Sequence, residues 1–376
     1  MSKAAELANL IGNINAGGGG TNKNLLINGN CAVAQRGDQS SKSSDHYSAV
    51  DRFEIQMSGS GAVTSTQSTT VPTGKGFNNS LKVDVVTNNG GSEDSGDYLL
   101  IMQKIEGLNL QQLKYGTSSA VPLACSFYVR SNLTGTFQFQ IEVPDSGSYK
   151  YYGKTYTINS ANTWEKKTIN IVANTNSSAI PDDNTEGLRV QWQLVGGSNY
   201  TSGTYTDEAW HGTGGNRLSS SVNNTFARST DNEFLLTGVQ LEVGQNPTEF
   251  EHEPFERTLS KCQRYLLRYP NDGGTNGGFT RYGTGQIVAS NEAEISIYPP
   301  VHMRVDPSLS IGGSASDYYI WNANDADSCS ALTVEGGSTH EYIVVNCVGS
   351  GMTAGRGCML NAYSNDTNFL QFDAEL

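Results

Sequence analysis

The sequence predicts an all-β protein, with an antiparallel jelly-roll sandwich followed by a smaller C-terminal β domain, a short N-terminal helix and one connector helix. Three observations predict this class. Apolar and polar residues alternate with period two in many short segments, and Gly, Ser, Thr and Asn separate these segments, with 42 glycines among 376 residues. Charged residues make up only 16% of the chain, whereas long helices are usually rich in Glu and Lys.

The alternation is clearest between residues 24 and 250, which we assign to the jelly roll. Residues 137–143 (FQFQIEV) and 188–194 (LRVQWQL) change from apolar to polar at every position. A strand of this kind turns its apolar side chains toward a core and its polar side chains toward solvent. Many such strands with turn residues between them are typical of a sandwich of two sheets.

Residues 1–16 have the spacing of a short helix. Leu7, Ile11 and Ile14 fall on one stripe, which predicts a helix that anchors the chain to another protein or self-associates. The alternative is a frayed terminal helix that packs on its own domain, because two heptads are too few to hold a coiled coil alone. The glycine-rich residues 17–23 are then a linker between this helix and the body.

A second helix is predicted over residues 251–270, where it connects the sandwich to a β domain at 271–376. Phe255, Leu259 and Leu266 have helical spacing, and a proline precedes them at a position suited to the first turn. The remaining residues return to short apolar runs that are typical of strands.

The net charge of −13 limits the partners that the sequence favours. Proteins that hold phosphate backbones normally carry a positive surface, so we expect no nucleic-acid partner. No apolar run is long enough for a membrane helix and no signal peptide is recognised, so we expect synthesis in a cytoplasm without membrane insertion. If the target were an acidic polysaccharide, the overall charge would not favour binding.

Metal binding is not favoured by the sequence. The six cysteines form no CxxC pair, and buried free thiols are the expected state. Four residues lie close enough in sequence to be considered as a metal cluster: Cys329, His340, Cys347 and Cys358. Their spacing matches no usual zinc pattern. Asp182 and Asp183 are weak candidates for calcium, with a solvated turn as the alternative, and no other cofactor is predicted.

No catalytic residue is predicted, and we expect the protein not to be an enzyme. The five histidines are scattered, and the sequence contains no nucleophile elbow and no phosphate-binding loop. A glycosidase with two carboxylates is a less favoured alternative, since abundant carboxylates do not define a site.

Aromatic-rich stretches are the sequence evidence for a binding function, because sugar-binding sites on β sandwiches usually carry exposed aromatic rings that stack on the faces of sugars. Three aromatic-rich stretches contain the candidates for glycan contact: Tyr149, Tyr151 and Tyr152; Tyr205 and Trp210; and Tyr318 and Trp321. The alternative is that these residues fill domain or subunit interfaces, where Tyr and Trp are equally enriched.

Several motifs then occur in a distinctive order: NLLINGN at 24–30, AQRG at 34–37, DRFEI at 51–55, QKIEGLNLQQL at 103–113 and LTGVQLEVGQNPTEFEHEPFERTLSKCQRYL at 236–266. In this order the chain resembles tail-fiber and related virion proteins of tailed bacteriophages, many of them from marine hosts. The resemblance covers roughly residues 1–270. It is weaker over 271–376, which we interpret as a terminal domain of the fiber type.

The resemblance implies a structural protein of the virion, made in the host cytoplasm. It implies a fiber or adhesin with a jelly roll like that of carbohydrate-binding modules. We expect a homo-oligomer, most simply a trimer, that contacts other virion proteins through the N-terminal helix and polysaccharide on the host surface. A knob or decoration protein on the capsid is the alternative, and a capsule depolymerase is less favoured.

Overall fold

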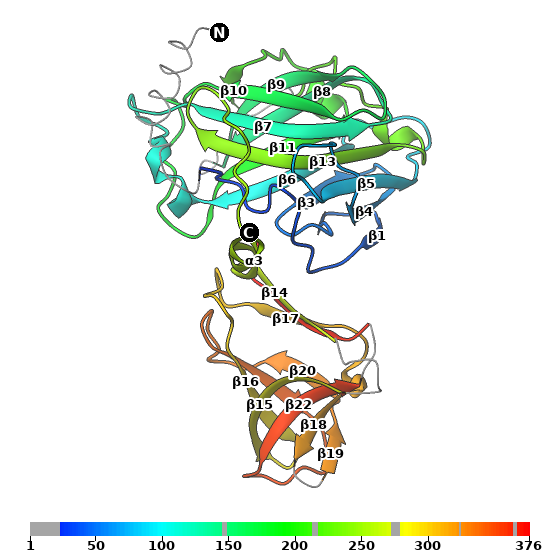
Figure 1. The fold of residues 1–376 in the computed structure, drawn as a ribbon, viewed down its shortest axis with the longest axis vertical. Helices are drawn as coiled ribbons and strands as arrows, with labels where there is room; N and C mark the ends of the chain where they lie inside the picture. The colour runs from blue at the N-terminus through cyan, green and yellow to red at the C-terminus, as the bar shows by residue number, and fades with distance from the viewer. Residues whose placement is uncertain (1–22, 145–148, 213–216, 272–278, 323–324, 364–366) are drawn as a thin grey trace. The chain divides into compact units, whose positions relative to one another are not determined.

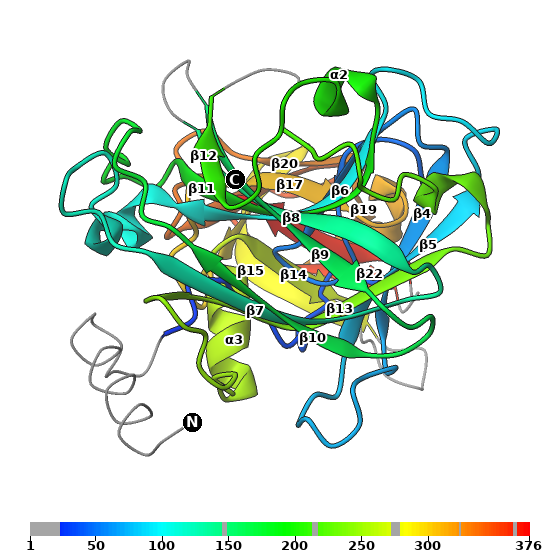
Figure 2. The same ribbon diagram turned by 90° about the horizontal axis from the view of Figure 1, so that it is seen from above.

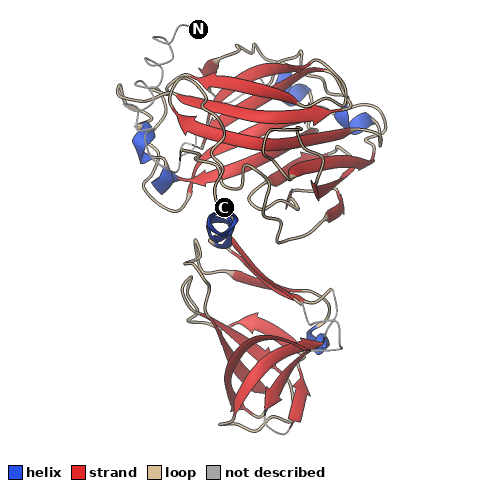
Figure 3. Cartoon of the chain, viewed as in Figure 1, coloured by secondary structure: helices blue, strands red, loops and turns tan. Residues whose placement is uncertain are grey.

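In the computed structural model of the chain, residues 23–144, 149–212, 217–271, 279–322, 325–363 and 367–376 are described. Strands are the main regular secondary structure in this part of the chain, and helices are few and short (Figure 3). No helix within the described ranges is both long and apolar enough to cross a membrane. The predicted N-terminal helix, with Leu7, Ile11 and Ile14, and most of the predicted linker lie outside the described residues.

The chain divides into two compact units, the first containing residues 1–258 and 376 and the second residues 259–375. In the first unit, one sheet has six strands in the order β1 (Gln39–Lys42), β4 (Ala62–Ser68), β5 (Ser80–Thr87), β13 (Glu233–Val243), β7 (Leu123–Ser131) and β10 (Glu165–Ile171). The other has seven, in the order β12 (Ala209–His211), β9 (Lys150–Ile158), β8 (Gly135–Val143), β11 (Glu186–Gly196), β6 (Tyr98–Glu106), β3 (Glu54–Ser58) and β2 (His46–Tyr47). These strands can be followed in Figures 1 and 2.

The core of the first unit lies between these two sheets and is rich in aromatic rings. Trp192 on β11 is completely buried. Its ring centroid lies 5.7 Å from that of Phe127 on β7 of the facing sheet and 5.7 Å from that of Phe139 on the neighbouring strand β8. Neighbouring strands pair antiparallel in both sheets. The predicted all-β jelly-roll class is therefore confirmed.

The second unit is also built from antiparallel strands. A seven-stranded sheet has the order β19 (Asp325–Ser328), β18 (Tyr318–Asn322), β22 (Gly357–Tyr363), β15 (Phe279–Ala289), β16 (Glu292–Ile297), β21 (Ile343–Val348) and β20 (Ala331–Val334). A smaller sheet contains β14 (Leu266–Pro270), β23 (Phe369–Asp373) and β17 (Ser308–Ile311). The unit has its own apolar core, to which both sheets contribute side chains.

The predicted connector helix is too long. Helix α3 covers only Phe255–Gln263, and the chain then forms strand β14. In β14, Leu266 and Leu267 are both buried, and the backbone pairs with β23, which lies near the end of the chain. This pairing satisfies the backbone groups that a longer helix would have used. Phe255, one of the apolar residues whose spacing predicted the helix, is 52% exposed.

All six cysteines are free and buried, as predicted. Burial raises the pKa of Cys31 to about 12, so this thiol stays protonated at neutral pH. No group of three or more metal-binding side chains occurs in the part of the chain that the structure describes. Cys329, Cys347 and Cys358 lie in the core of the second unit, whereas His340 is partly exposed and lies 3.5 Å from Asp306.

Candidate functional site

The outward face of the seven-stranded sheet in the first unit carries an unusual row of amide side chains. Core residues such as Trp192 face inward, so their neighbours Gln191 and Gln193 on β11 face outward. On the adjacent strand β8, Gln140 lies directly opposite Gln191, and Glu142 lies opposite Arg189. The strand register therefore collects polar groups from both strands into one patch.

These polar groups form a continuous hydrogen-bonded chain. The Gln193 amide donates to the side-chain oxygens of Gln140 (3.0 Å) and Gln191 (2.8 Å). Gln191 in turn donates to Glu142 (3.0 Å), which also accepts a hydrogen bond from Arg189 (2.7 Å). The three amides and the carboxylate are each less than 5% exposed. Buried polar groups with partners of this kind have fixed orientations.

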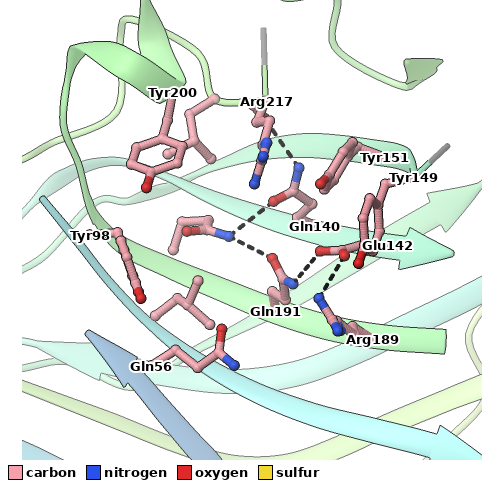
Figure 4. Close-up of a pocket in the computed structure, with 13 residues that line it drawn as sticks. Gln56, Tyr98, Gln140, Glu142, Tyr149, Tyr151, Arg189, Gln191, Tyr200 and Arg217 are labelled. Atoms are coloured by element: carbon pink, nitrogen blue, oxygen red, sulfur yellow. Dashed lines mark hydrogen bonds and ion pairs between the residues drawn. The ribbon is translucent and has the colours of Figure 1, made fainter. Parts of the chain in front are cut away.

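A cavity of about 340 Å³ lies above this chain, which is within the range of roughly 300 to 1,000 Å³ that is typical of ligand pockets (Figure 4). Two tyrosine pairs stand on opposite sides of its floor. Tyr98 and Tyr200 meet edge to face with their ring centroids 5.9 Å apart, and Tyr149 and Tyr151 stack at 6.3 Å. Tyr200 comes from the short helix α2 (Ser198–Thr201).

A loop beside the cavity is attached to the same floor. The backbone oxygen of Arg217 accepts hydrogen bonds from the amides of Gln138 (2.7 Å) and Gln140 (3.3 Å). The backbone N–H of Ser219 donates to the Gln138 side-chain oxygen (2.8 Å), and that of Leu218 donates to the backbone oxygen of Tyr200 (3.0 Å). The Arg217 side chain is thereby held at the cavity (Figure 4).

Burial controls the charges at the floor. It raises the pKa of Glu142, and the positive charge of Arg189 and the hydrogen bond from Gln191 counteract part of this increase. Burial also raises the pKa of Tyr151 to about 12, with the nearby charge of Glu142 adding to the effect, so this hydroxyl stays neutral at ordinary pH. For Arg189, burial favours loss of the proton, but the hydrogen bond with Glu186 and the two nearby carboxylates raise its pKa overall.

Comparison with known proteins gives distant likenesses. No protein-family model and no curated protein matches the sequence. Among solved structures, the chain is similar to a putative sugar binding protein from Bacteroides thetaiotaomicron, at 12% identity over 58% of this chain and 99% of that one, with a TM-score of 0.30. It is similar to the CBM22-2 xylan-binding domain of Xyn10C from Paenibacillus barcinonensis, at 18% identity over 50% and 91%, with a TM-score of 0.27.

The chain is also similar to the enzymatically active domain of tailspike protein 4 from bacteriophage CBA120, at 11% identity and a TM-score of 0.29. This match covers 51% of the present chain but only 19% of the tailspike chain, about a fifth of its length. The resemblance to phage tail fibers therefore stays a prediction, and the function proposed below depends on the geometry of the cavity.

Two of the predicted glycan-contact residues line the cavity, namely Tyr149 and Tyr151. Tyr149 is half-buried, whereas Tyr151 is only 2% exposed and has the Arg217 guanidinium over its ring. Their neighbour Tyr152 faces the core, is completely buried and donates a hydrogen bond from its hydroxyl to the backbone oxygen of Asn170 (2.6 Å). Tyr318 is also completely buried, with its hydroxyl bound to the backbone oxygen of Gly312 (2.9 Å). Neither Tyr152 nor Tyr318 offers a ring face to a ligand, so we withdraw both as candidates.

The other predicted aromatic residues lie away from the cavity lining. The Tyr205 hydroxyl donates to Asp207 (2.8 Å). The Trp210 ring packs against Tyr152 and its indole N–H donates to the backbone oxygen of Val172 (2.8 Å), which is a structural role. Trp321 belongs to the second unit and is 40% exposed.

The proposed calcium candidates form a turn. Asp182 and Asp183 are exposed, and the carboxylate of Asp183 accepts a hydrogen bond from the backbone N–H of Thr185 (2.9 Å). Hydrogen bonds from Thr185 also lower the pKa of Asp183. This arrangement is the self-contained Asp turn that is common in loops, and it matches the alternative of a solvated turn.

Sequence reasoning missed the glutamines of the floor. Their signal was present, because Gln138 and Gln140 on one strand and Gln191 and Gln193 on another repeat at every second position. A strand face that is open to water more often carries Lys, Glu or Thr than repeated Gln. The side-chain amide of Gln both donates and accepts hydrogen bonds, so several amides side by side can bond to one another. Repeated amides on adjacent strands thus mark a polar face that is covered or that binds a ligand.

Replacement of Glu142 by Gln tests the burial of this carboxylate. Because the folded state raises its pKa above the ordinary 4.5, the folded protein binds this proton more tightly than the unfolded chain does. We expect the wild type to gain stability relative to Glu142→Gln as the pH falls through the raised pKa toward 4.5. Urea unfolding at several pH values from about 7 to about 3 measures this difference.

Glu165→Gln is a control for which we expect the opposite pH dependence of stability. Its carboxylate is slightly desolvated, but hydrogen bonds from Lys167, Ser160 and Asn159 lower its pKa to about 2. The wild type should therefore lose stability relative to this variant as the pH falls below 4.5 toward about 2. If both variants changed in the same direction, or if Glu142→Gln showed no pH dependence, the account of the floor would be wrong.

Proposed function

We propose that this protein binds a glycan in the cavity of its first unit. The observation that carries the proposal is the buried floor of hydrogen-bonded amides between two pairs of tyrosines. Sugar hydroxyls are both donors and acceptors, and amide groups complement them in either direction. The half-buried rings of Tyr98, Tyr149 and Tyr200 add the aromatic surface on which the C–H faces of a sugar pack.

Binding without cleavage is the form of this function that the cavity supports best. Hydrolysis of a glycosidic bond usually needs two carboxyl groups that flank the bond. Glu142 is the one carboxylate among the described residues that line the cavity, and it is already engaged by Arg189 and Gln191. We therefore propose an adhesin rather than a depolymerase.

Replacing Gln191 with Leu tests the floor most directly. The change keeps the size of the side chain but removes its hydrogen bonds, and an unsatisfied buried partner costs about 1–3 kcal/mol. We expect affinity for the best ligand in a panel of xylan, β-glucan, alginate and bacterial capsule polysaccharides to fall about tenfold or more. Isothermal titration calorimetry measures the loss, and thermal unfolding shows whether the variant is folded.

Trp321→Ala is the matched control, because it removes an exposed aromatic residue from the other unit. We expect this variant to bind as the wild type does. Loss of binding in Trp321→Ala together with unchanged binding in Gln191→Leu would place the site in the second unit and contradict the proposal.

We further propose that the protein acts as part of a phage particle, as a trimeric fiber or adhesin, with a capsid decoration protein as the alternative. The ordered motifs between residues 24 and 266 support this proposal. Deletion of residues 1–16 should abolish incorporation into particles while leaving glycan binding intact. Particle assembly with the truncated chain, followed by immunoblotting of purified virions, measures incorporation. Normal incorporation would contradict an anchoring role for this segment.

A further inference from the structure

The lining of the cavity contains two guanidinium groups, and one of them is fully engaged. Arg189 donates to Glu142 (2.7 Å) and through a second nitrogen to Glu186 (2.9 Å), so two carboxylates surround it. The group adds little positive charge to the cavity, because its own partners balance it. Its place on β11 makes it part of the floor.

Arg217 differs from Arg189 in having no such partner. Among the described residues, none forms a hydrogen bond or an ion pair with its guanidinium, and its Nε is buried and unsatisfied. The group lies instead over two aromatic rings, 4.8 Å from the ring centroid of Tyr151 and 5.5 Å from that of Tyr200. Contacts with these ring faces hold the cation but do not neutralise it.

The position of this cation is fixed from two directions. The rings of Tyr151 and Tyr200 hold its side chain, and the amides of Gln138 and Gln140 hold its backbone oxygen. Figure 4 shows the guanidinium pointing down toward the amide floor between the tyrosine pairs. A partly buried charge without a counter-ion is costly. The chain carries 37 acidic against 24 basic residues, yet no described carboxylate forms an ion pair with this group. The nearest influence is Glu142: burial raises the pKa of that carboxyl, and the charge of Arg217 counteracts a small part of the increase.

We infer that the glycan bound in this cavity carries a carboxylate, as hexuronic acids do, and that Arg217 receives it. The inference depends on the proposed glycan binding and adds the chemical class of the ligand. A planar guanidinium matches a carboxylate with paired hydrogen bonds, and charge assistance makes such bonds stronger than those between neutral groups. The amides of the floor then bind the hydroxyls of the same sugar or of the next one.

Matched polymers test this inference. Polygalacturonate, alginate, glucuronoxylan and hyaluronan are each compared with the same polymer after its carboxyl groups have been reduced to alcohols. Affinity is measured by calorimetry on the full-length protein at low ionic strength and again at high ionic strength. We expect at least one acidic polymer to bind about tenfold more tightly than its reduced form, and this ratio to shrink as salt screens the charge.

Two variants test whether Arg217 causes the preference for acidic polymers over their reduced forms. In Arg217→Gln the ratio between the acidic and the reduced polymer should fall to about one, whereas Arg217→Lys, which keeps the charge, should retain part of it. Thermal unfolding of both variants confirms that they are folded. A ratio unchanged in Arg217→Gln, or equal binding of every acidic polymer and its reduced form by the wild type, would overturn the inference and leave glycan binding intact. If neither these polymers nor the xylan, β-glucan and capsule polysaccharides of the first panel bound, the proposed function itself would fail.

Discussion

The period-two geometry of strands β8 and β11 is the constraint on which both the core and the cavity depend. Trp192 packs against Phe127 and Phe139 in the core, so the residues on either side of it must face the opposite way. Gln191 and Gln193 occupy these positions and form the floor of the cavity. A shift of one residue in register would exchange the two sets. Packing of the core thus also fixes the position of the amides.

Hydrogen bonding within the floor preorganises the side chains that line the cavity. Burial of an amide without a partner is unfavourable, and the chain from Gln193 through Gln191 to Glu142 avoids this cost before any ligand arrives. A ligand then meets groups that are already ordered, which reduces the entropy lost on binding. Arg217 is the exception, since rings hold its charge in place while no described carboxylate forms an ion pair with it. The amides of the floor thus have their hydrogen-bond partners before a ligand binds, whereas the guanidinium of Arg217 is left to bind a group of the ligand.

The fold could be predicted because strand alternation is local, whereas the site depends on contacts that sequence patterns do not contain. Residues 137–143 correctly indicated which side chains face the core, but alternation cannot show that loops cover the opposite face. The adjacent residues Tyr151 and Tyr152 must face opposite sides of β9, so both could not have been ligand contacts. Strand β14 was missed because its partner β23 is distant in sequence. Arg217 lies in a loop, where no periodic pattern predicts the direction of a side chain. The net charge of −13 also gives no sign that a positive group lies at the cavity.

The central claim is that the amide floor of the first unit is the surface that a glycan contacts. Side-chain amide signals of glutamine can be followed by NMR in protein labelled with 15N at glutamine, and single Gln substitutions assign them. During titration with the best-binding oligosaccharide, we expect saturable shifts in the signals of Gln140, Gln191 and Gln193. Saturable binding that leaves these three signals unchanged while other glutamines shift would contradict the account.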